Sequence, residues 1–308
     1  MLSIIVPAYN EEKTIQICYE RILSLFSINI AKYINSYEII FVDDGSTDTT
    51  WTLIKKLMHH DSNVHGVKFS RNFGKESAIF AGLEKAHGEC AIIMDCDLQH
   101  PPEYIIKMLS YYREGYQIVR CVKKHRNKET TLRRICNSLF FSFFNFFDSG
   151  QLNIVNVSDF QLVDRKAIDY ILKFQETSLF FRGISAYIGF RVKDIEFDVL
   201  ERVAGKSKWS YKTLFDYALS NMTAFSSKPL QIVTFNGIIL FLLAIILTIR
   251  TLYVYFINAA APGITTVIIL LLFIGSMLMI SLGIIGFYIG KIFDEVKRRP
   301  RYIIDEEE

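Results

Sequence analysis

The 308-residue sequence lacks the cysteine spacing of a disulfide framework or a zinc site. Its five cysteines are scattered and form no C-x-x-C pair, as expected for reduced thiols in a cytosolic domain. The N-terminus also lacks a basic segment followed by an apolar core and a cleavage site, because the strand-like stretch 2–6 begins almost at once. We therefore expect no signal peptide.

Two common nucleotide-binding motifs are missing as well. Gly205-Lys206-Ser207 resembles the end of a P-loop, but Leu200 stands where that motif needs another glycine. No G-x-G-x-x-G follows a predicted strand, so a nicotinamide- or flavin-binding Rossmann domain is unsupported. The net charge is only +3, and we expect no nucleic-acid partner.

Charged residues are missing from two long stretches, 229–249 and 251–290, the second of which is interrupted at 259–263. This pattern predicts two transmembrane helices, at about 231–257 and 264–290, joined by a tight hairpin. Each helix would be ~40 Å long, more than the ~30 Å hydrocarbon layer, so we expect it to tilt or protrude.

Basic residues flank both predicted spans. Lys206, Lys208, Lys212 and Lys228 precede the first, and Lys291, Lys297, Arg298, Arg299 and Arg301 follow the second. The positive-inside rule then places both termini on the cytoplasmic side of the inner (plasma) membrane, in a multi-pass topology. The expected organisation is a cytosolic domain, 1–228, a transmembrane part, 229–291, and a cytosolic tail, 292–308. The last residues, 305–308, are predicted to be a solvated tail with no role.

Short apolar runs alternate with longer amphipathic ones through residues 1–121. Strands are predicted at 2–6, 37–42, 64–69, 90–94 and 117–121, with helices between them, and a further strand at 190–197. The pattern predicts an α/β domain with a mostly parallel sheet flanked by helices. Ligands of such sheets bind beyond the carboxyl ends of the strands, so the residues that follow each strand are the ones to examine.

Acidic residues follow two of these strands. By itself, Asp43-Asp44-Gly45-Ser46 indicates a turn and a helix cap. Together with Asp95 and Asp97, however, it gathers four carboxylates around one rim, which is costly unless a cation or hydrogen-bond donors occupy it. A ligand site is the better interpretation.

The segment Asp95-Cys96-Asp97 follows an apolar run and precedes Pro101-Pro102. In an extended chain Asp95 and Asp97 share one face while Cys96 points to the other. Two converging carboxylates suit Mg²⁺ or Mn²⁺, which keep other positions for water and phosphate. A nucleotide diphosphate is then a reasonable partner, although an isolated D-x-D is more often simply solvated.

A basic stretch, 120–134, runs into the phenylalanine-rich segment 139–147. We expect helices at about 131–147 and 210–227 to lie in the lipid headgroup layer; the alternative is an ordinary core beside a solvated basic face. Two isolated features stay open at this point. Arg202 and Lys208 lie in a glycine-containing loop that suits an anionic substrate, whereas Asp159 alone indicates the cap or end of a turn.

Taken in order, these motifs resemble those of the family-two glycosyltransferases with the GT-A fold, and among them the polyprenyl-phosphate glycosyltransferases: the bactoprenol glucosyltransferases and the dolichol-phosphate mannose synthases. The resemblance rests on segments 6–11, 42–46, 71–76, 95–99, 158–160 and 202–209, followed by the two spans. There are two departures. Cys96 replaces a small alanine, and 286–290 lacks the acid that relatives often carry there.

The resemblance implies roles for individual residues and implies a homo-oligomer, a tetramer in bacterial members. Asp159 would be the catalytic residue. The nucleotide would contact Pro7, Tyr9, Glu11, Asp43, Asp44 and Asp95; a divalent cation, Mg²⁺ or Mn²⁺, would contact Asp95, Asp97 and Gln99; and the diphosphate or acceptor phosphate would contact Arg202, Ser207, Lys208, Arg120, Arg133 and Arg134.

The predicted reaction is inverting transfer of one hexose, glucose, from a UDP-sugar to undecaprenyl phosphate at the cytoplasmic face of the bilayer. The product would serve modification of a cell-surface glycan such as a wall polymer or lipopolysaccharide. A monoester phosphate is mostly ionised at neutral pH and hardly needs a base, so Asp159 is expected chiefly to orient acceptor and sugar.

Three alternatives stay open. A processive polysaccharide synthase is disfavoured because those enzymes usually have more spans and a Q-x-x-R-W motif, of which this chain has only Ser207-Lys208-Trp209. A catalytically silent, nucleotide-binding membrane scaffold is a second possibility. A flippase or channel is disfavoured because neither predicted span contains an acid or a paired charge.

Overall fold

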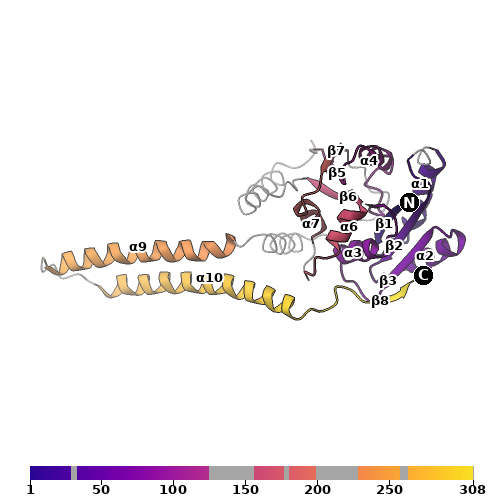
Figure 1. The fold of residues 1–308 in the computed structure, drawn as a ribbon. Helices are drawn as coiled ribbons and strands as arrows, with labels where there is room; N and C mark the ends of the chain where they lie inside the picture. Colours follow the sequence, from indigo (N-terminus) through magenta and orange to yellow (C-terminus); the bar gives the residue numbers. More distant parts are fainter. Residues whose placement is uncertain (29–32, 125–155, 177–179, 199–227, 257–262, 308) are drawn as a thin grey trace.

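The structure is a computed structural model that describes residues 1–28, 33–124, 156–176, 180–198, 228–256 and 263–307. These residues form an α/β domain from which two long helices extend (Figure 1). The predicted interfacial helices at about 131–147 and 210–227 lie outside the described residues.

The described strands form one eight-stranded sheet in the order β7-β5-β6-β4-β1-β2-β3-β8. The pairings make six strands run in one direction, while β6 and β8 run antiparallel to their neighbours. The predicted mostly parallel sheet is therefore confirmed. The strand bounds are β1 Leu2–Ala8, β2 Tyr37–Asp43, β3 Val64–Phe69, β4 Cys90–Ile93, β5 Ile118–Lys123, β6 Val157–Asp164, β7 Val192–Phe197 and β8 Ile304–Glu307.

Helices cover both faces of the sheet (Figure 1). Helices α1 (Ile15–Ile28), α2 (Thr50–His60) and α4 (Tyr104–Arg113) pack on one face, around one apolar cluster. Helices α3 (Lys75–Lys85), α6 (Arg165–Ile171) and α7 (Phe181–Tyr187) pack on the other. The central strands are buried on both sides, which explains why they read as continuous apolar runs rather than alternating ones.

Strand β6 was not predicted. Its sequence, VSDFQLVD, mixes polar and apolar residues and lacks the long apolar run of a parallel strand. All but the last of its residues are nevertheless buried, because it lies between β4 and β5 in the middle of the sheet. The interpretation of Asp159 as the cap or end of a turn is therefore wrong: this residue lies within a central strand.

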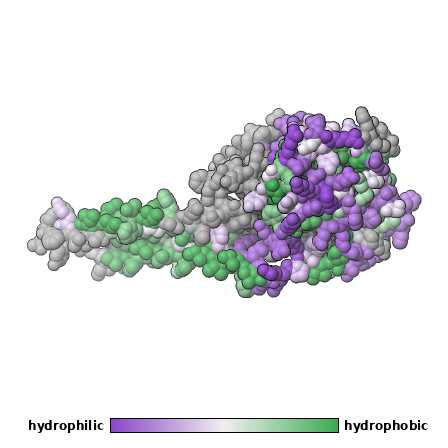
Figure 2. Space-filling view, in the orientation of Figure 1, coloured by the Kyte–Doolittle hydropathy of each residue, from purple (hydrophilic) through white to green (hydrophobic). Residues whose placement is uncertain are grey.

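Two helices, α9 (Lys228–Phe256) and α10 (Ile264–Val296), contact one another and extend away from the sheet. Apolar residues cover much of their surface, in contrast to the largely hydrophilic domain (Figure 2). Among the described residues, one segment, Phe273–Val296, is long and apolar enough to cross a membrane, and Phe235–Leu247 is a shorter apolar stretch. Exposed side chains such as Phe241 and Leu271 would be costly in water. These helices indicate membrane association.

The C-terminal residues correct a second expectation. Instead of a solvated tail, Ile304–Glu307 form β8, which pairs antiparallel with β3 at the edge of the sheet. Acids of this strand lie beside lysines: Glu306 contacts Lys55 and Lys68, each at 3.0 Å. The sequence alone predicts a solvated run of acids at 305–308, because the lysines that neutralise these acids come from distant parts of the chain.

Candidate active site

The carboxyl end of β4 and the beginning of β6 lie side by side. Their antiparallel register pairs Ile93 with Gln161, and continuing it by two residues brings Asp95 beside Asp159. Because β6 runs against the other central strands, its first residues lie at the edge where those strands end. This geometry adds Asp159 to the acids at the edge where the strands end. We call Asp43, Asp44, Asp95, Asp97 and Asp159 the acidic rim.

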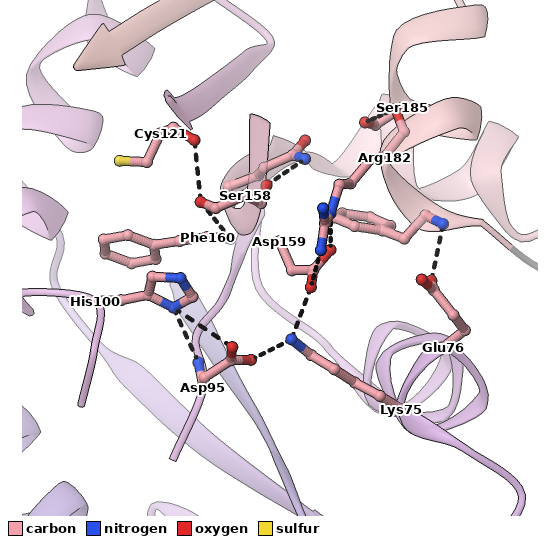
Figure 3. A network of polar contacts seen from close by, with 12 residues as sticks. Lys75, Glu76, Asp95, His100, Cys121, Ser158, Asp159, Phe160, Arg182 and Ser185 are labelled. Atoms are coloured by element: carbon pink, nitrogen blue, oxygen red, sulfur yellow. Dashed lines mark hydrogen bonds and ion pairs between the residues drawn. The ribbon is translucent and has the colours of Figure 1, made fainter. Parts of the chain in front are cut away.

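Two cations hold Asp159 (Figure 3). Arg182, on α7, binds it in a bidentate manner, with Nε 2.6 Å from Oδ1 and Nη2 2.9 Å from Oδ2. Lys75, the first residue of α3, places its Nζ 2.7 Å from Asp159 Oδ2 and 2.6 Å from Asp95 Oδ1. One ammonium group therefore connects the acid at the end of β4 with the acid on β6.

These contacts decide the protonation of the acids. Burial by itself would raise the pKa of Asp159, but Arg182 and Lys75 hold that pKa well below its ordinary value. Burial would also raise the pKa of Asp95, but the charge of Lys75, its hydrogen bond to Asp95 and the nearby His100 together lower that pKa. Burial opposes the charge of Lys75 as well, yet the two carboxylates raise its pKa. All three groups are charged at neutral pH.

A hydrogen bond between α3 and α7 supports this arrangement. The backbone N–H of Phe181 donates to Glu76 Oε2 at 2.8 Å, directly beside Lys75 and Arg182 in the sequence. The two cations consequently approach Asp159 from helices that are joined to each other (Figure 3).

The exposure of Asp95, Cys96 and Asp97 alternates as predicted, although the chain turns at 96–97 and Leu98 has φ +56°, so the segment is not the expected extended strand. Asp95, Asp97 and Gln99 are partly exposed, whereas Cys96, Leu98 and His100 are buried. The buried imidazole of His100 stacks on Phe160 and lies with Nδ1 3.5 Å from the Asp95 backbone nitrogen. Burial lowers the pKa of His100 to about 4, so this ring is neutral at pH 7.

Asp43 and Asp44 have different surroundings. Both are almost fully buried at the end of β2. Asp43 Oδ1 accepts the Ser46 N–H at 3.1 Å, but no donor among the described residues reaches Asp43 Oδ2. Asp44 accepts the N–H groups of Phe73 and Gly74 at 2.7 and 3.1 Å. Burial raises the pKa of Asp43 and raises that of Asp44 to about 6.

The loop after β1 lies against the loop after β2. The backbone N–H of Asn10 donates to Ser46 Oγ, and that of Glu11 donates to Thr50 Oγ1, both at 2.8 Å. Pro7 and Tyr9 belong to this same β1 segment, whose residues Pro7 and Ala8 pair with Val42 and Asp43. Three of the predicted nucleotide contacts therefore come from one segment next to Asp43.

Asp95, Asp97 and Gln99 follow β4, as expected for a cation site. Among the described residues no group of three or more His, Cys, Asp or Glu is placed to hold a metal ion. Ions of the Mg²⁺ type, however, are usually held by one or two carboxylates plus substrate phosphates. The partly exposed Asp95 and Asp97 fit such an ion, with Asp97 Oδ1 also accepting the Gln99 N–H at 3.1 Å.

The remaining predicted site residues are basic or hydroxyl-bearing. Arg120 lies on β5 and is almost fully buried, and its guanidinium binds Asp194 of β7 at 2.8 and 2.9 Å. The others, Arg133, Arg134, Arg202, Ser207 and Lys208, lie outside the described residues.

Sequence reasoning assigned no function to Arg182 and none to Lys75. Lys75 lies in the motif segment 71–76, to which no role for this residue was attached, and Arg182 lies in no motif. Only the strand order brings both to Asp159. The sequence does not indicate that α3 and α7 are joined, because the hydrogen bond between Glu76 and Phe181 spans 105 positions.

Comparison with known proteins identifies the family of this chain. The sequence model of glycosyl transferase family 2 matches residues 3–172, a span that contains Asp43, Asp44, Asp95, Asp97 and Asp159. The chain belongs to this family. It is accordingly a glycosyltransferase, and the predicted resemblance is confirmed at that level.

Full-length relatives agree with this assignment. The chain is 39% identical over 308 residues to the putative glycosyltransferase CsbB of Bacillus subtilis (strain 168), covering 99% of this chain and 92% of that one. It is 35% identical over 307 residues to the SfII prophage-derived bactoprenol glucosyl transferase of Shigella flexneri, covering 98% and 97%. Among solved structures, glucosyl-3-phosphoglycerate synthase from Mycobacterium tuberculosis in complex with Mn²⁺, UDP and phosphoglyceric acid is 19% identical, covers 71% of this chain and 75% of that one, and gives a TM-score of 0.45.

Proposed function

We propose that this glycosyltransferase moves a single hexose, glucose, from a UDP-sugar to undecaprenyl phosphate, with inversion at the anomeric carbon. A phosphate oxygen of the acceptor forms the new bond to the anomeric carbon while the bond to the UDP diphosphate breaks, which releases UDP. Similarity along nearly the whole chain to a bactoprenol glucosyl transferase carries this proposal, because it includes both the catalytic domain and the apolar helices.

The donor is assigned to the β1 and β2 ends of the rim. Asp43 offers a buried acceptor atom, Oδ2, that no described donor satisfies, and an orphaned buried acceptor costs free energy until a ligand supplies a donor. A nucleoside has such N–H and O–H groups. Pro7, Tyr9 and Glu11 lie on the adjoining segment and would line the same pocket.

The diphosphate is assigned to the end of β4. A bound Mg²⁺ or Mn²⁺ would supply positive charge for the leaving diphosphate, and Asp95, Asp97 and Gln99 would hold it there. Lys75 already contacts Asp95 at 2.6 Å and would supply further positive charge beside the reacting groups. Arg202, Ser207 and Lys208 would complete the phosphate contacts.

Asp159 is assigned an orienting role. Three charge-assisted hydrogen bonds occupy its oxygens, and its lowered pKa makes it a weak base. A polyprenyl phosphate with a second pKa of about 6 is itself largely ionised at neutral pH. Asp159 would fix Lys75 and Arg182 in positions from which they would contact the acceptor phosphate, instead of removing a proton.

The membrane would determine where the acceptor phosphate meets the catalytic domain. We propose that α9 and α10 both cross the membrane, with the catalytic domain, 1–228, on the cytoplasmic side. The apolar surface of these helices supports this arrangement (Figure 2). The lipid phosphate would then arrive at the headgroup level next to the domain.

The test is a transfer assay with the purified full-length protein in vesicles. Labelled UDP-glucose, undecaprenyl phosphate and Mn²⁺ are supplied, and UDP and lipid-linked sugar are measured separately. We expect one UDP for each lipid-linked sugar, with Asp97→Asn as the inactive control. A polymeric product would instead identify a processive synthase, and nucleotide binding without UDP release would identify a scaffold.

A further inference from the structure

The structure joins the end of the apolar helix α10 to the loop that leads into Lys75. We define the strap as residues 301–307, which follow α10 and include β8. The strap lies beside β3, where its strand β8 forms the edge of the sheet (Figure 1), and it contacts α3. We propose that it is a positioning element for the transfer reaction, in which Tyr302 fixes the loop 70–74 and thereby Lys75. This inference rests on the proposed function.

Contacts of the strap concentrate at the start of that loop. The Ser70 N–H donates to the Ile303 carbonyl at 3.0 Å, immediately after β3. The ring of Tyr302 stacks on Phe69, with centroids 4.8 Å apart and planes 14° apart, and its hydroxyl donates to Glu84. Tyr302 thus joins the last residue of β3 to α3.

Arg301 contacts the first turns of α3. Its carbonyl accepts the hydroxyl of Ser77 at 3.4 Å, and its guanidinium lies 5.4 Å from the centre of the Phe80 ring. Lys75 belongs to this same turn of helix. The strap therefore contacts Phe69 just before the loop, Ser70 at its first position and Ser77 after it.

The opposite side of the loop is held by the acidic rim. Phe73 and Gly74 donate their N–H groups to Asp44. Gly45, at φ +68°, comes so close to the loop that a Cβ there would lie 2.3 Å from the Arg71 carbonyl carbon. The loop is consequently clamped between Asp44 and the strap, and Lys75 at its end reaches Asp95 and Asp159.

Charge complementarity anchors the strap from its far end. Asp305 and Glu306 lie 3.2 and 3.0 Å from Lys68, and Glu307 lies 2.7 Å from Lys85. These pairs are partly exposed, so each contributes little by itself. The backbone pairing of β8 and the stacking of the partly buried Tyr302 ring on the buried Phe69 fix the position of the strap.

The experiment compares full-length Tyr302→Ala, Tyr302→Phe and Tyr112→Ala in vesicles. Tyr112 is a matched control, because its hydroxyl also donates to an acid, Asp164, but far from the loop. Two readouts are taken: hydrogen exchange of the peptide that covers residues 69–77, and kcat and KM for transfer of labelled glucose to undecaprenyl phosphate.

For Tyr302→Ala we expect exchange in 69–77 to be ~10-fold faster and kcat to fall ~10-fold, since the change removes both the ring stack on Phe69 and the apolar surface that the ring covers. The donor KM should change less than threefold, roughly, because Asp43 is untouched. Tyr302→Phe keeps the stack and should recover most of both values, and Tyr112→Ala should leave exchange in 69–77 unchanged.

Unaltered exchange and unaltered kcat in Tyr302→Ala would overturn the inference, as would equal effects of Tyr302→Ala and Tyr112→Ala. Should Tyr302→Ala fold poorly, Tyr302→Leu is used: it keeps apolar volume without the ring stack, and the same pattern is expected at smaller size. If the unmodified protein transfers no sugar, the proposed function fails, while the exchange comparison still decides whether the strap fixes the loop.

Discussion

Two pairs of acids at one edge of the sheet differ in what neutralises them. Asp43 and Asp44 are buried, no cation among the described residues contacts them, and burial raises both pKa values. Asp95 and Asp159 share Lys75, Asp159 also binds Arg182, and their pKa values are lowered. The first pair can accept hydrogen bonds from donors that a bound ligand supplies. The second is a set of charges whose positions are fixed before any ligand arrives, which is the arrangement that stabilises developing charge best.

The largest expected effect is at the end of β4. Asp97→Asn removes a carboxylate from the group that would hold the divalent cation, so transfer should fall ~1000-fold. Measuring single-turnover transfer over a range of Mn²⁺ concentrations checks this, and we expect more Mn²⁺ to be needed for half-maximal rate. If Asp97→Asn has the same rate and the same Mn²⁺ dependence as the unmodified protein, Asp97 does not hold the cation.

The next effect separates orientation from base catalysis. Asp159→Asn should lower kcat ~100-fold, because Lys75 and Arg182 lose the carboxylate that aligns them. The loss should persist from pH 6 to pH 9, since the acceptor phosphate is already ionised over most of that range. Full recovery of the rate on raising the pH alone would show that Asp159 acts as a base.

A smaller effect is expected at Arg182, for which sequence reasoning predicted no role. Arg182→Ala leaves Asp159 with Lys75 alone, and we expect kcat to fall ~10-fold. The pKa of Asp159 should rise, which would be visible by NMR or as a new acid limb in the pH–rate profile. Arg182→Lys keeps the charge but not the bidentate geometry and should be intermediate; equal rates for all three proteins would exclude the positioning role.

The smallest change concerns Asp44, whose folded-state pKa is raised by burial to about 6. Between pH ~4 and ~6 the unfolded chain loses this proton before the folded protein does, so stability falls as the pH rises through that window. Asp44→Asn lacks this loss. The unfolding free energy of the unmodified protein, relative to Asp44→Asn, should therefore decrease by on the order of 3 kcal/mol from pH 4 to pH 7. Denaturant titrations at several pH values check this, and parallel curves would contradict it.

Sequence patterns predicted much of this molecule because the central strands are apolar on both faces and end in polar residues. The exposure of Asp95 and Asp97 and the burial of Cys96 could be predicted from a period of two, but the turn that the chain makes there could not. The antiparallel strands β6 and β8 were missed for a common reason. Neither has a long apolar run: β6 is buried with polar side chains that find partners, and β8 is acidic and meets lysines from elsewhere.

The contacts of the two cations with Asp159 were unpredictable for a topological reason. Lys75 and Arg182 begin helices that are separated by more than a hundred residues, and only the position of β6 between β4 and β5 brings both to Asp159. A rule that looks at the ends of parallel strands finds Asp95 but cannot find a residue at the beginning of an antiparallel one. The resemblance to a family supplied Asp159, and the structure supplied its partners.

The contrast between the two acid pairs is the centre of the account, and UDP binding tests it most directly. The full-length protein, Asp43→Asn and Asp159→Asn are titrated with UDP in the presence of Mn²⁺, and transfer is measured on the same samples. We predict that Asp43→Asn weakens UDP binding ~10-fold or more, whereas Asp159→Asn binds UDP within about threefold of the unmodified protein and yet loses transfer. Equal loss of UDP binding in both variants, or normal UDP binding by Asp43→Asn, would contradict the division of the rim into a donor-binding pair and a reacting pair.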